Sequence, residues 1–283
     1  MKKLISLALA LIFCMATLAG CGSSASQQSS QPSSTGTATA STVKTINDGV
    51  LTMGTNAAFP PYEYYDGNNI VGIDPEIATL IAEKLGMKLE IVDMDFSSII
   101  TSVQTGKIDI GMAGMTVTPE RQKNVNFATS YATGVQVVIV PENSSIKSVD
   151  DLNAMLKAGQ DFLIGTQEGT TGFTYASDTP ENGGFGQDHV VAYTNGATAV
   201  QALKDGKVDC VIIDNEPAKA YVAANPGLKI LDTAYVQEDY AIAVSKDNQA
   251  LLDAINNAIQ ELTADGSIKA VLDKYITATP AAQ

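Results

Sequence analysis

The stretch from Gly106 to Arg121 reads Gly-Lys-Ile-Asp-Ile-Gly-Met-Ala-Gly-Met-Thr-Val-Thr-Pro-Glu-Arg. Its apolar run, Ile108 to Met112, is typical of a short buried strand. Thr118-Pro119-Glu120 predicts the start of a helix, because a capping hydroxyl precedes a proline at the first helical position and an acid in the first turn. Arg121 follows within that first turn. The stretch therefore predicts a buried strand that leads directly into a helix.

This junction gathers groups that could bind an anion. Gly111 and Gly114 leave room for another group to approach the backbone. Thr116 adds a hydroxyl and a backbone N–H, and the Arg121 guanidinium can hold a carboxylate or phosphate through two hydrogen bonds. The alternative is a plain strand–turn–helix connection in which Arg121 pairs with a surface acid.

A second copy of the pattern favours a ligand site. Ser102–Met112 and Ala202–Ile212 align without gaps, 100 residues apart, and Met53–Asn56 resembles Ile164–Gln167. The chain therefore contains two similar α/β units. In such units ligands lie beyond the carboxyl ends of the strands. If the two units face each other, four strand ends line one cleft, near Asn56, Thr116, Gln167 and Asp214.

The amino-terminal segment predicts export. Residues 1–20 combine two early lysines with an apolar run, as in a secretory signal. Leu18-Ala19-Gly20-Cys21 resembles the bacterial lipobox, in which the cysteine is lipidated, and the alternative is an ordinary small-residue cleavage site. Residues 21–44 are rich in Ser, Thr and Gln and predict a disordered tether.

Composition narrows the function classes. The formal net charge of −14 argues against nucleic-acid binding, which needs a basic surface. No stretch after residue 20 is long and apolar enough to span a membrane. Cys210 is the one cysteine beyond Cys21, so no disulfide framework is expected, and we interpret it as a core residue. The spacing of His, Cys and Asp predicts no metal site, and no cofactor is expected; His189 is interpreted as structural or surface.

Seven segments together carry a resemblance to the polar amino-acid family of extracellular solute-binding proteins, family 3. Pro75 departs from the aliphatic residue usual at its position in that family, which affects helix entry alone. The resemblance covers roughly residues 44 to 277. The segments are Gly54–Glu63, Gly72–Ile77, Ala113–Arg121, Val125–Tyr131, Gly165–Gly172, Gly206–Asp214 and Ala264–Ser267.

The resemblance implies an α/β fold of the two-lobe, type II periplasmic-binding-protein kind, with two crossover hinges and a ligand cleft between the lobes. The crossovers are expected at Tyr131–Val135 and Val236–Tyr240. Lobe one would comprise residues 45–131 and 240–278, and lobe two residues 136–235. The segment from Ser177 to Gln187, rich in Gly, Pro and acids, is expected to be a surface loop.

The same resemblance implies roles for the site residues. Arg121 would take the ligand α-carboxylate, and Asp214 the α-ammonium, with the Gly114 carbonyl and the Thr116 hydroxyl. Phe59 and Phe96 would enclose the ligand side chain, although Phe59 could instead be a core residue. The full expected set is Asn56, Phe59, Phe96, Ala113, Gly114, Thr116, Arg121, Gln167, Thr170, Thr171 and Asp214.

The side chain of the ligand is expected to be polar. Asn56 and Gln167 would bind its end, and many relatives that bind cationic side chains carry an acid at the Asn56 position. Asparagine there favours glutamine or cystine over arginine or another basic amino acid, although Glu168 or Asp93 could compensate.

The implied function is the binding component of an ABC importer. Its partners would be a free amino acid and the permease subunits. The protein would be a monomer outside the cytoplasmic membrane, attached only through a lipid on Cys21. Two alternatives are a dehydratase of the same fold, with Glu168 as general acid, and a surface adhesin or sensory partner.

Overall fold

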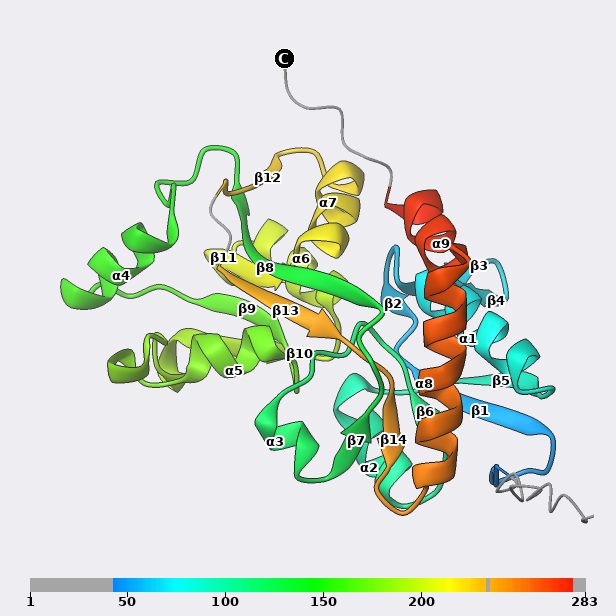
Figure 1. Cartoon of the computed structure of the whole chain (residues 1–283). Coiled ribbons are helices and arrows are strands. Elements are labelled where there is room, and N and C mark those ends of the chain that lie inside the picture. The colour runs from blue at the N-terminus through cyan, green and yellow to red at the C-terminus, as the bar shows by residue number, and fades with distance from the viewer. Residues whose placement is uncertain (1–42, 233–234, 277–283) are drawn as a thin grey trace, which may run out of the picture. The chain divides into compact units, whose positions relative to one another are not determined.

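Two sheets organise the part of the chain that the computed structural model describes, residues 43–232 and 235–276, which belongs to one compact unit (Figure 1). The first sheet defines lobe one and has the strand order β5-β1-β6-β14-β7. In it β1 runs parallel to β5 and β6, whereas β14 runs antiparallel to β6 and β7. The strands are β1 (Val50–Thr55), β5 (Lys88–Asp93), β6 (Ile110–Gly111), β7 (Val125–Phe127) and β14 (Ala243–Ser245).

Lobe one also carries a small three-stranded sheet and five helices. The apolar residues of α1 recur every fourth position, at Ile73, Ile77 and Ile81, and all three side chains are fully buried. Gly72 precedes α1 at φ 132°, and a Cβ there would lie 2.2 Å from the Tyr62 carbonyl oxygen, so the position requires glycine. These elements are β2 (Ala58–Phe59), β3 (Glu63–Asp66), β4 (Asn69–Val71), α1 (Ile73–Lys84), α2 (Phe96–Gln104), α3 (Pro119–Gln122), α8 (Gln249–Ala264) and α9 (Ser267–Tyr275).

The second sheet defines lobe two, with the order β10-β9-β11-β8-β12 and β13 paired to β8. Cys210 lies fully buried in β11 and is a free cysteine within its core, as its apolar setting predicts. The elements of this lobe are β8 (Ala132–Pro141), α4 (Val149–Lys157), β9 (Ile164–Gln167), α5 (Thr171–Ser177), η1 (Pro180–Asn182), η2 (Gln187–His189), β10 (Val190–Tyr193), α6 (Gly196–Lys204), β11 (Cys210–Asp214), α7 (Asn215–Ala224), β12 (Leu228–Ile230) and β13 (Val236–Tyr240).

The chain passes between the sheets along two strands that pair with each other. β8 and β13 are antiparallel, with Ala132 opposite Tyr240 and Gln136 opposite Val236. β13 then leads back to β14 in the sheet of lobe one, as Figure 1 shows. The crossovers are therefore a hydrogen-bonded two-stranded ribbon, which couples them.

The internal repeat of the sequence corresponds to a repeated structural device. Each copy is a helix followed by a buried strand, α2 to β6 and α6 to β11. The Asp109 carboxylate accepts the Thr52 N–H at 2.8 Å, and the Asp209 carboxylate accepts the Leu163 N–H at 2.8 Å. The two aspartates thus tie each strand start to its neighbour, so the repeat marks strand pairing rather than ligand chemistry.

The prediction of a surface loop at Ser177–Gln187 is wrong in part. The segment contains η1 and the start of η2, and Phe185 is 1% exposed. The Phe185 ring packs edge-on against Phe162, with ring centres 5.9 Å apart, and His189 stacks on Phe162 from 4.2 Å. One aromatic residue therefore folds a polar segment back onto the core of lobe two.

No helix within the described residues has the length and apolar character needed to cross a membrane. Residues 1–42 lie outside the described part, and so do the predicted signal, the lipobox at Cys21 and nearly all of the tether.

Candidate functional site

A pocket between the two lobes is lined by twelve residues, and all eleven expected from the sequence are among them. The twelfth is Glu63, from β3. The pocket has a cavity volume of about 20 Å³, because side chains of the two lobes meet across it. The roles of these residues toward a ligand stay predictions. The lining residues are Asn56, Phe59, Glu63, Phe96, Ala113, Gly114, Thr116, Arg121, Gln167, Thr170, Thr171 and Asp214.

Arg121 lies in the first turn of α3 and bridges the lobes. Thr118 caps the helix, and its hydroxyl accepts the Arg121 backbone N–H at 3.1 Å. The guanidinium donates to the Thr116 carbonyl in lobe one at 2.7 Å and to the Gly169 carbonyl in lobe two at 3.0 Å. Its carbon lies 5.2 Å from the centre of the Phe96 ring. None of the ion pairs among the described residues involves Arg121, so N–H donors remain for an anionic ligand.

Asp214 lies at the carboxyl end of β11 and is 7% exposed. Its carboxylate accepts a hydrogen bond from the Tyr240 hydroxyl, on the second crossover strand. Burial raises the pKa of Asp214 to about 7, the Tyr240 hydrogen bond opposes that shift, and the Glu238 carboxylate adds to it. A cation placed beside Asp214 would favour its ionised form, which is the role expected of a ligand ammonium.

Gly114 and Thr116 follow β6 and form the backbone floor of the pocket. Gly114 has φ +52°, and a Cβ there would lie 2.8 Å from the Phe59 ring. Its N–H donates to the Asp74 carboxylate at 2.8 Å. The Thr116 hydroxyl donates to the Glu238 carboxylate at 3.1 Å. Both residues are therefore fixed by buried acids behind the pocket.

Asn56 and Gln167 close one end of the pocket from opposite lobes. The Gln167 amide nitrogen donates to the Asn56 side-chain oxygen at 2.9 Å and to the Thr194 carbonyl at 3.3 Å. The Asn56 amide nitrogen donates to the Met94 carbonyl at 2.9 Å. Gln167 thus uses both of its amide protons and Asn56 one of its two, so the side-chain oxygens of both residues and one Asn56 N–H are left for a ligand at this end.

Phe59 is a buried core residue that also lines the pocket. It is 7% exposed and belongs to a hydrophobic cluster that includes residues of both lobes, with its ring centre 5.8 Å from that of Tyr62. It also lines the pocket, opposite residues of lobe two. One face of the pocket is therefore a rigid part of the core.

The start of α5 presents lobe two to the pocket. The Thr170 hydroxyl accepts the Phe173 N–H at 3.2 Å and caps the helix. The Thr171 hydroxyl donates to Glu238 at 2.9 Å. Glu168, three residues before Thr171, is exposed and does not line the pocket, and Asp93 accepts the Ala57 N–H at 2.9 Å. An acid that replaces the missing carboxylate at position 56 for a cationic ligand would have to line the pocket. Neither Glu168 nor Asp93 does so.

Two buried acids were not predicted from the sequence, Glu63 and Glu238. Glu63 lines the pocket, and Glu238 lies behind it. Glu63 is 1% exposed, and neither of its carboxyl oxygens has a hydrogen-bond partner among the described residues. Burial, and next the Asp74 carboxyl, raise the pKa of Glu63 well above its usual range. Burial also raises the pKa of Asp74 to about 6, although the Gly114 N–H and the Tyr131 hydroxyl bind its carboxylate. The available signal was an acid within the aromatic stretch Phe59–Tyr64.

Glu238 is the second missed acid. It lies on β13, is 5% exposed and accepts three side-chain hydrogen bonds on one oxygen. The run Val236–Tyr240 reads as an exposed polar strand in the sequence, and nothing local shows that Glu238 is buried.

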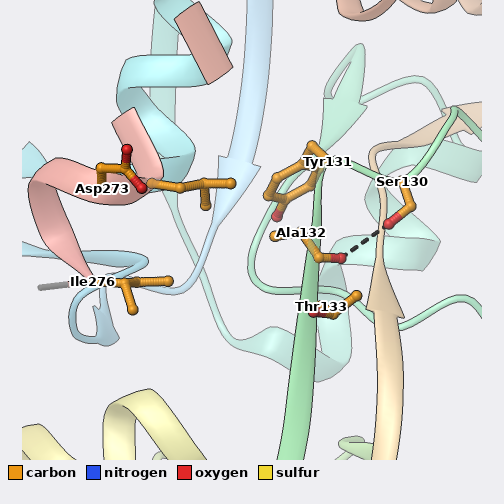
Figure 2. Close-up of a pocket in the computed structure, with 7 residues that line it drawn as sticks. Ser130, Tyr131, Ala132, Thr133, Asp273 and Ile276 are labelled. Atoms are coloured by element: carbon orange, nitrogen blue, oxygen red, sulfur yellow. Dashed lines mark hydrogen bonds between the residues drawn. The ribbon is translucent and has the colours of Figure 1, made fainter. Parts of the chain in front are cut away.

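A more open pocket of about 440 Å³ lies elsewhere, between the start of β8 and the carboxyl end of α9. Figure 2 shows Ser130, Ala132 and Thr133 on one side and Asp273 and Ile276 on the other. Asp273 is its one charged lining residue, and Lys269 already pairs with it at 2.6 Å. This pocket therefore lacks the convergent charged groups found between the lobes.

Comparison with known proteins agrees with this architecture. The model of the bacterial extracellular solute-binding proteins, family 3, matches residues 51–278. The arginine-binding extracellular protein ArtP of Bacillus subtilis (strain 168) is 33% identical over 231 residues, which cover 80% of this chain and 86% of ArtP. The ABC transporter glutamine-binding protein GlnH of the same organism is 30% identical over 285 residues, 99% of this chain and 100% of GlnH.

A solved structure supports the same conclusion. An ancestral arginine-binding protein bound to glutamine is 40% identical to this chain with a TM-score of 0.73, and the match covers 81% of this chain and 99% of that one. The two-lobe, type II periplasmic-binding-protein fold expected from the sequence is confirmed. The chain belongs to family 3 of the bacterial extracellular solute-binding proteins.

Proposed function

We propose that this protein captures a free polar amino acid outside the cytoplasm and delivers it to the membrane subunits of an ABC importer. The observation that carries the proposal is one pocket with a guanidinium and a carboxyl, Arg121 and Asp214, drawn from opposite lobes. An amino-acid zwitterion supplies a partner for each, so that neither charge is buried unpaired. Lobe one would comprise residues 45–131 and 240–278, and lobe two residues 136–235.

A thermal-shift screen of the twenty amino acids, cystine and ornithine tests this proposal. A ligand that binds only the native state stabilises it by about 2.7 kcal/mol at a hundredfold excess over its dissociation constant. One or a few amino acids should raise the melting temperature clearly, and a screen without any shift would contradict the proposal. Incubation of the protein with each stabilising ligand, followed by product analysis, tests the dehydratase alternative. The general acid expected for that alternative, Glu168, is exposed and does not line the pocket.

The ligand side chain is proposed to end in hydrogen-bond donors. Asn56 and Gln167 each leave a side-chain oxygen that can accept from a ligand, which suits an amide and equally a guanidinium. Glutamine or a cystine-like ligand is favoured because Asn56 and Gln167, which would bind the end of the ligand side chain, are both uncharged. Arginine is the second candidate. The relatives named for arginine and for glutamine are consistent with both.

We expect Asn56→Asp to shift the preference toward basic amino acids. Aspartate keeps the oxygen that accepts from Gln167 and adds a negative charge, while the donor to the Met94 carbonyl is lost. The ratio of arginine to glutamine affinity should rise about tenfold, since a partly desolvated charge pair contributes on the order of 1.4 kcal/mol or more. Calorimetry with both ligands measures the ratio.

Asn68→Asp is the matched control, because Asn68 lies in the exposed turn between β3 and β4. If Asn56→Asp keeps the wild-type ratio of arginine to glutamine affinity, the end of the ligand side chain does not lie beside Asn56.

The attachment to the membrane is proposed to be a lipid on Cys21, with the protein monomeric. Leu18–Cys21 ends the apolar run of the predicted signal and is followed by the predicted tether. Cys21→Ala should block lipid-dependent processing, leaving the protein in the soluble or loosely held fraction, since dual acylation is what makes anchoring stable. Membrane fractionation and the mass of the mature amino terminus check this. Unchanged fractionation together with an unchanged mass would contradict the anchor.

A further inference from the structure

The Glu238 carboxylate lies where the two lobes and the second crossover meet. One of its oxygens accepts from the Thr116 hydroxyl at 3.1 Å, the Thr171 hydroxyl at 2.9 Å and the Gln136 amide at 2.9 Å. Its other oxygen is buried without a partner among the described residues. Three buried donors from different elements thus converge on a single side chain of β13.

The three donors come from both sides of the cleft. Thr116 follows β6 in lobe one, Thr171 begins α5 in lobe two, and Gln136 lies on β8, the first crossover strand. Thr116 and Thr171 also line the ligand pocket, whereas Glu238 does not. Glu238 therefore reaches the pocket through the two hydroxyls that it holds.

The direction of these hydrogen bonds fixes what the hydroxyls can offer a ligand. A hydroxyl has one proton and two acceptor lone pairs, and a carboxylate only accepts. Because Thr116 and Thr171 both give their protons to Glu238, each hydroxyl oxygen is left as an acceptor. An ammonium group has only donors, so this arrangement suits the positive end of a zwitterion beside Asp214 and disfavours a group that can only accept, such as a carboxylate, at the same place.

We propose that Glu238 is a positioning residue, which sets the Thr116 and Thr171 hydroxyls as acceptors for the ligand ammonium and joins both lobes to the crossover strand. The proposal rests on the proposed function, because it assigns the selectivity of the same pocket for an α-amino group. The two consequences are linked, since the two hydrogen bonds that orient the hydroxyls also connect the lobes to β13.

Glu238→Gln changes this arrangement with little change of shape. Glutamine keeps one oxygen in the place where the three donors converge, but that oxygen carries no negative charge and an NH₂ group stands beside it, so the Thr116 and Thr171 protons are held less firmly. If a hydroxyl turns, its proton points into the pocket and opposes the ligand ammonium. Affinity for the amino acid should fall about tenfold or more, given the strength of hydrogen bonds to charged groups.

The discriminating measurement compares an amino acid with its analogue lacking the α-amino group. L-Glutamine is paired with 4-carbamoylbutanoate, or L-arginine with 5-guanidinopentanoate, whichever amino acid the wild-type protein binds. The wild-type protein should strongly prefer the amino acid, and Glu238→Gln should narrow that preference about tenfold while analogue affinity barely changes. Thr116→Val, which removes one acceptor and leaves Glu238 charged, should narrow the preference in the same direction.

Asp239→Asn is the matched control, because Asp239 is the next residue on β13 and is exposed. It removes the same charge and should keep the wild-type preference, and thermal unfolding of every variant verifies its fold. The double variant Glu238→Gln/Thr116→Val should lose less than the sum of the two single variants, because they share the contact between Glu238 and Thr116.

Wild-type binding is measured first and tests the proposed function separately. If the wild-type protein binds an amino acid and Glu238→Gln weakens amino acid and analogue equally, Glu238 is merely structural and the inference is overturned. Unchanged affinity for both ligands in Glu238→Gln would overturn it as well.

Discussion

Arg121→Ala and Asp214→Ala are each expected to abolish amino-acid binding at concentrations that saturate the wild-type protein. Each variant leaves one end of the zwitterion without its partner in a closed, desolvated pocket. Truncating one member of such a charge pair costs on the order of 2–5 kcal/mol, which is about thirtyfold or more in affinity. Isothermal calorimetry with the ligand found in the screen measures the loss.

The two variants should remain folded, for different reasons. Arg121 lies in a four-residue helix and its guanidinium bonds only to backbone carbonyls. Asp214 is a buried carboxyl whose pKa is raised mainly by burial, so its removal relieves a desolvation cost. Lys123→Ala and Asp188→Ala are controls, because both side chains are exposed and lie outside the pocket. Tight binding by either Arg121→Ala or Asp214→Ala would refute this placement of the zwitterion.

Part of the pocket lining was predictable from local signals, and the full set was predicted from the resemblance to the family. Arg121 follows a capping threonine and a proline, and those three residues alone determine where α3 begins. Asn56, Gln167 and Asp214 each end or directly follow a buried strand. Since the carboxyl ends of strands in such a sheet are where ligands lie, a list of strand ends is already a list of candidate site residues.

Glu63 and Glu238 were not predictable in this way, because their burial depends on residues far along the chain. Glu238 accepts from Thr116 and Gln136, 122 and 102 residues earlier. Its own neighbours, Gln237 and Asp239, are exposed, so the local pattern is that of a polar strand. Only the pairing of the two crossover strands places its side chain between the lobes.

Phe185 is a residue that was predicted to lie in a surface loop and is buried. Its segment is rich in the residues that favour turns, so composition predicted a loop at the surface. The Phe162 ring offers an apolar partner that composition does not reveal, and the backbone turns back through Gly184, where a Cβ would lie 2.2 Å from the Asp178 carbonyl oxygen. A single long-range contact thus decided the burial of Phe185.

The last prediction concerns closure of the cleft without ligand, which should depend on pH through Asp214. In the closed arrangement burial raises the pKa of this carboxyl to about 7, while in an open, hydrated cleft it should return toward its usual value near 4. A group whose pKa rises on closure stabilises the closed form, and this stabilisation is complete at a pH below the lower of the two pKa values. The stabilisation disappears as the pH rises through 7. Between pH 8 and pH 5 the closed form should therefore gain about a hundredfold in its equilibrium with the open form.

Several neighbouring groups determine the strength of this dependence, and they also define the test. Glu238 and Tyr240 face Asp214 from β13, and Arg121 approaches from lobe one. Asp74 and Glu63 titrate as well, but both lie within lobe one. Asp214→Asn removes the Asp214 carboxyl and leaves the acids of lobe one in place, so this variant should stay closed at both pH values.

Small-angle scattering measures this equilibrium directly. The ligand-free wild-type protein should have a smaller radius of gyration at pH 5 than at pH 8. At pH 8 a saturating amino acid should produce the same decrease, because its ammonium neutralises the ionised Asp214 in place of a proton. A ligand shifts the equilibrium only by its differential affinity for the two forms, and here the difference arises because residues of both lobes reach one molecule only when the cleft is closed. A radius of gyration that is the same at pH 5 and pH 8, and unchanged by a ligand proven to bind, would show that Asp214 does not control closure.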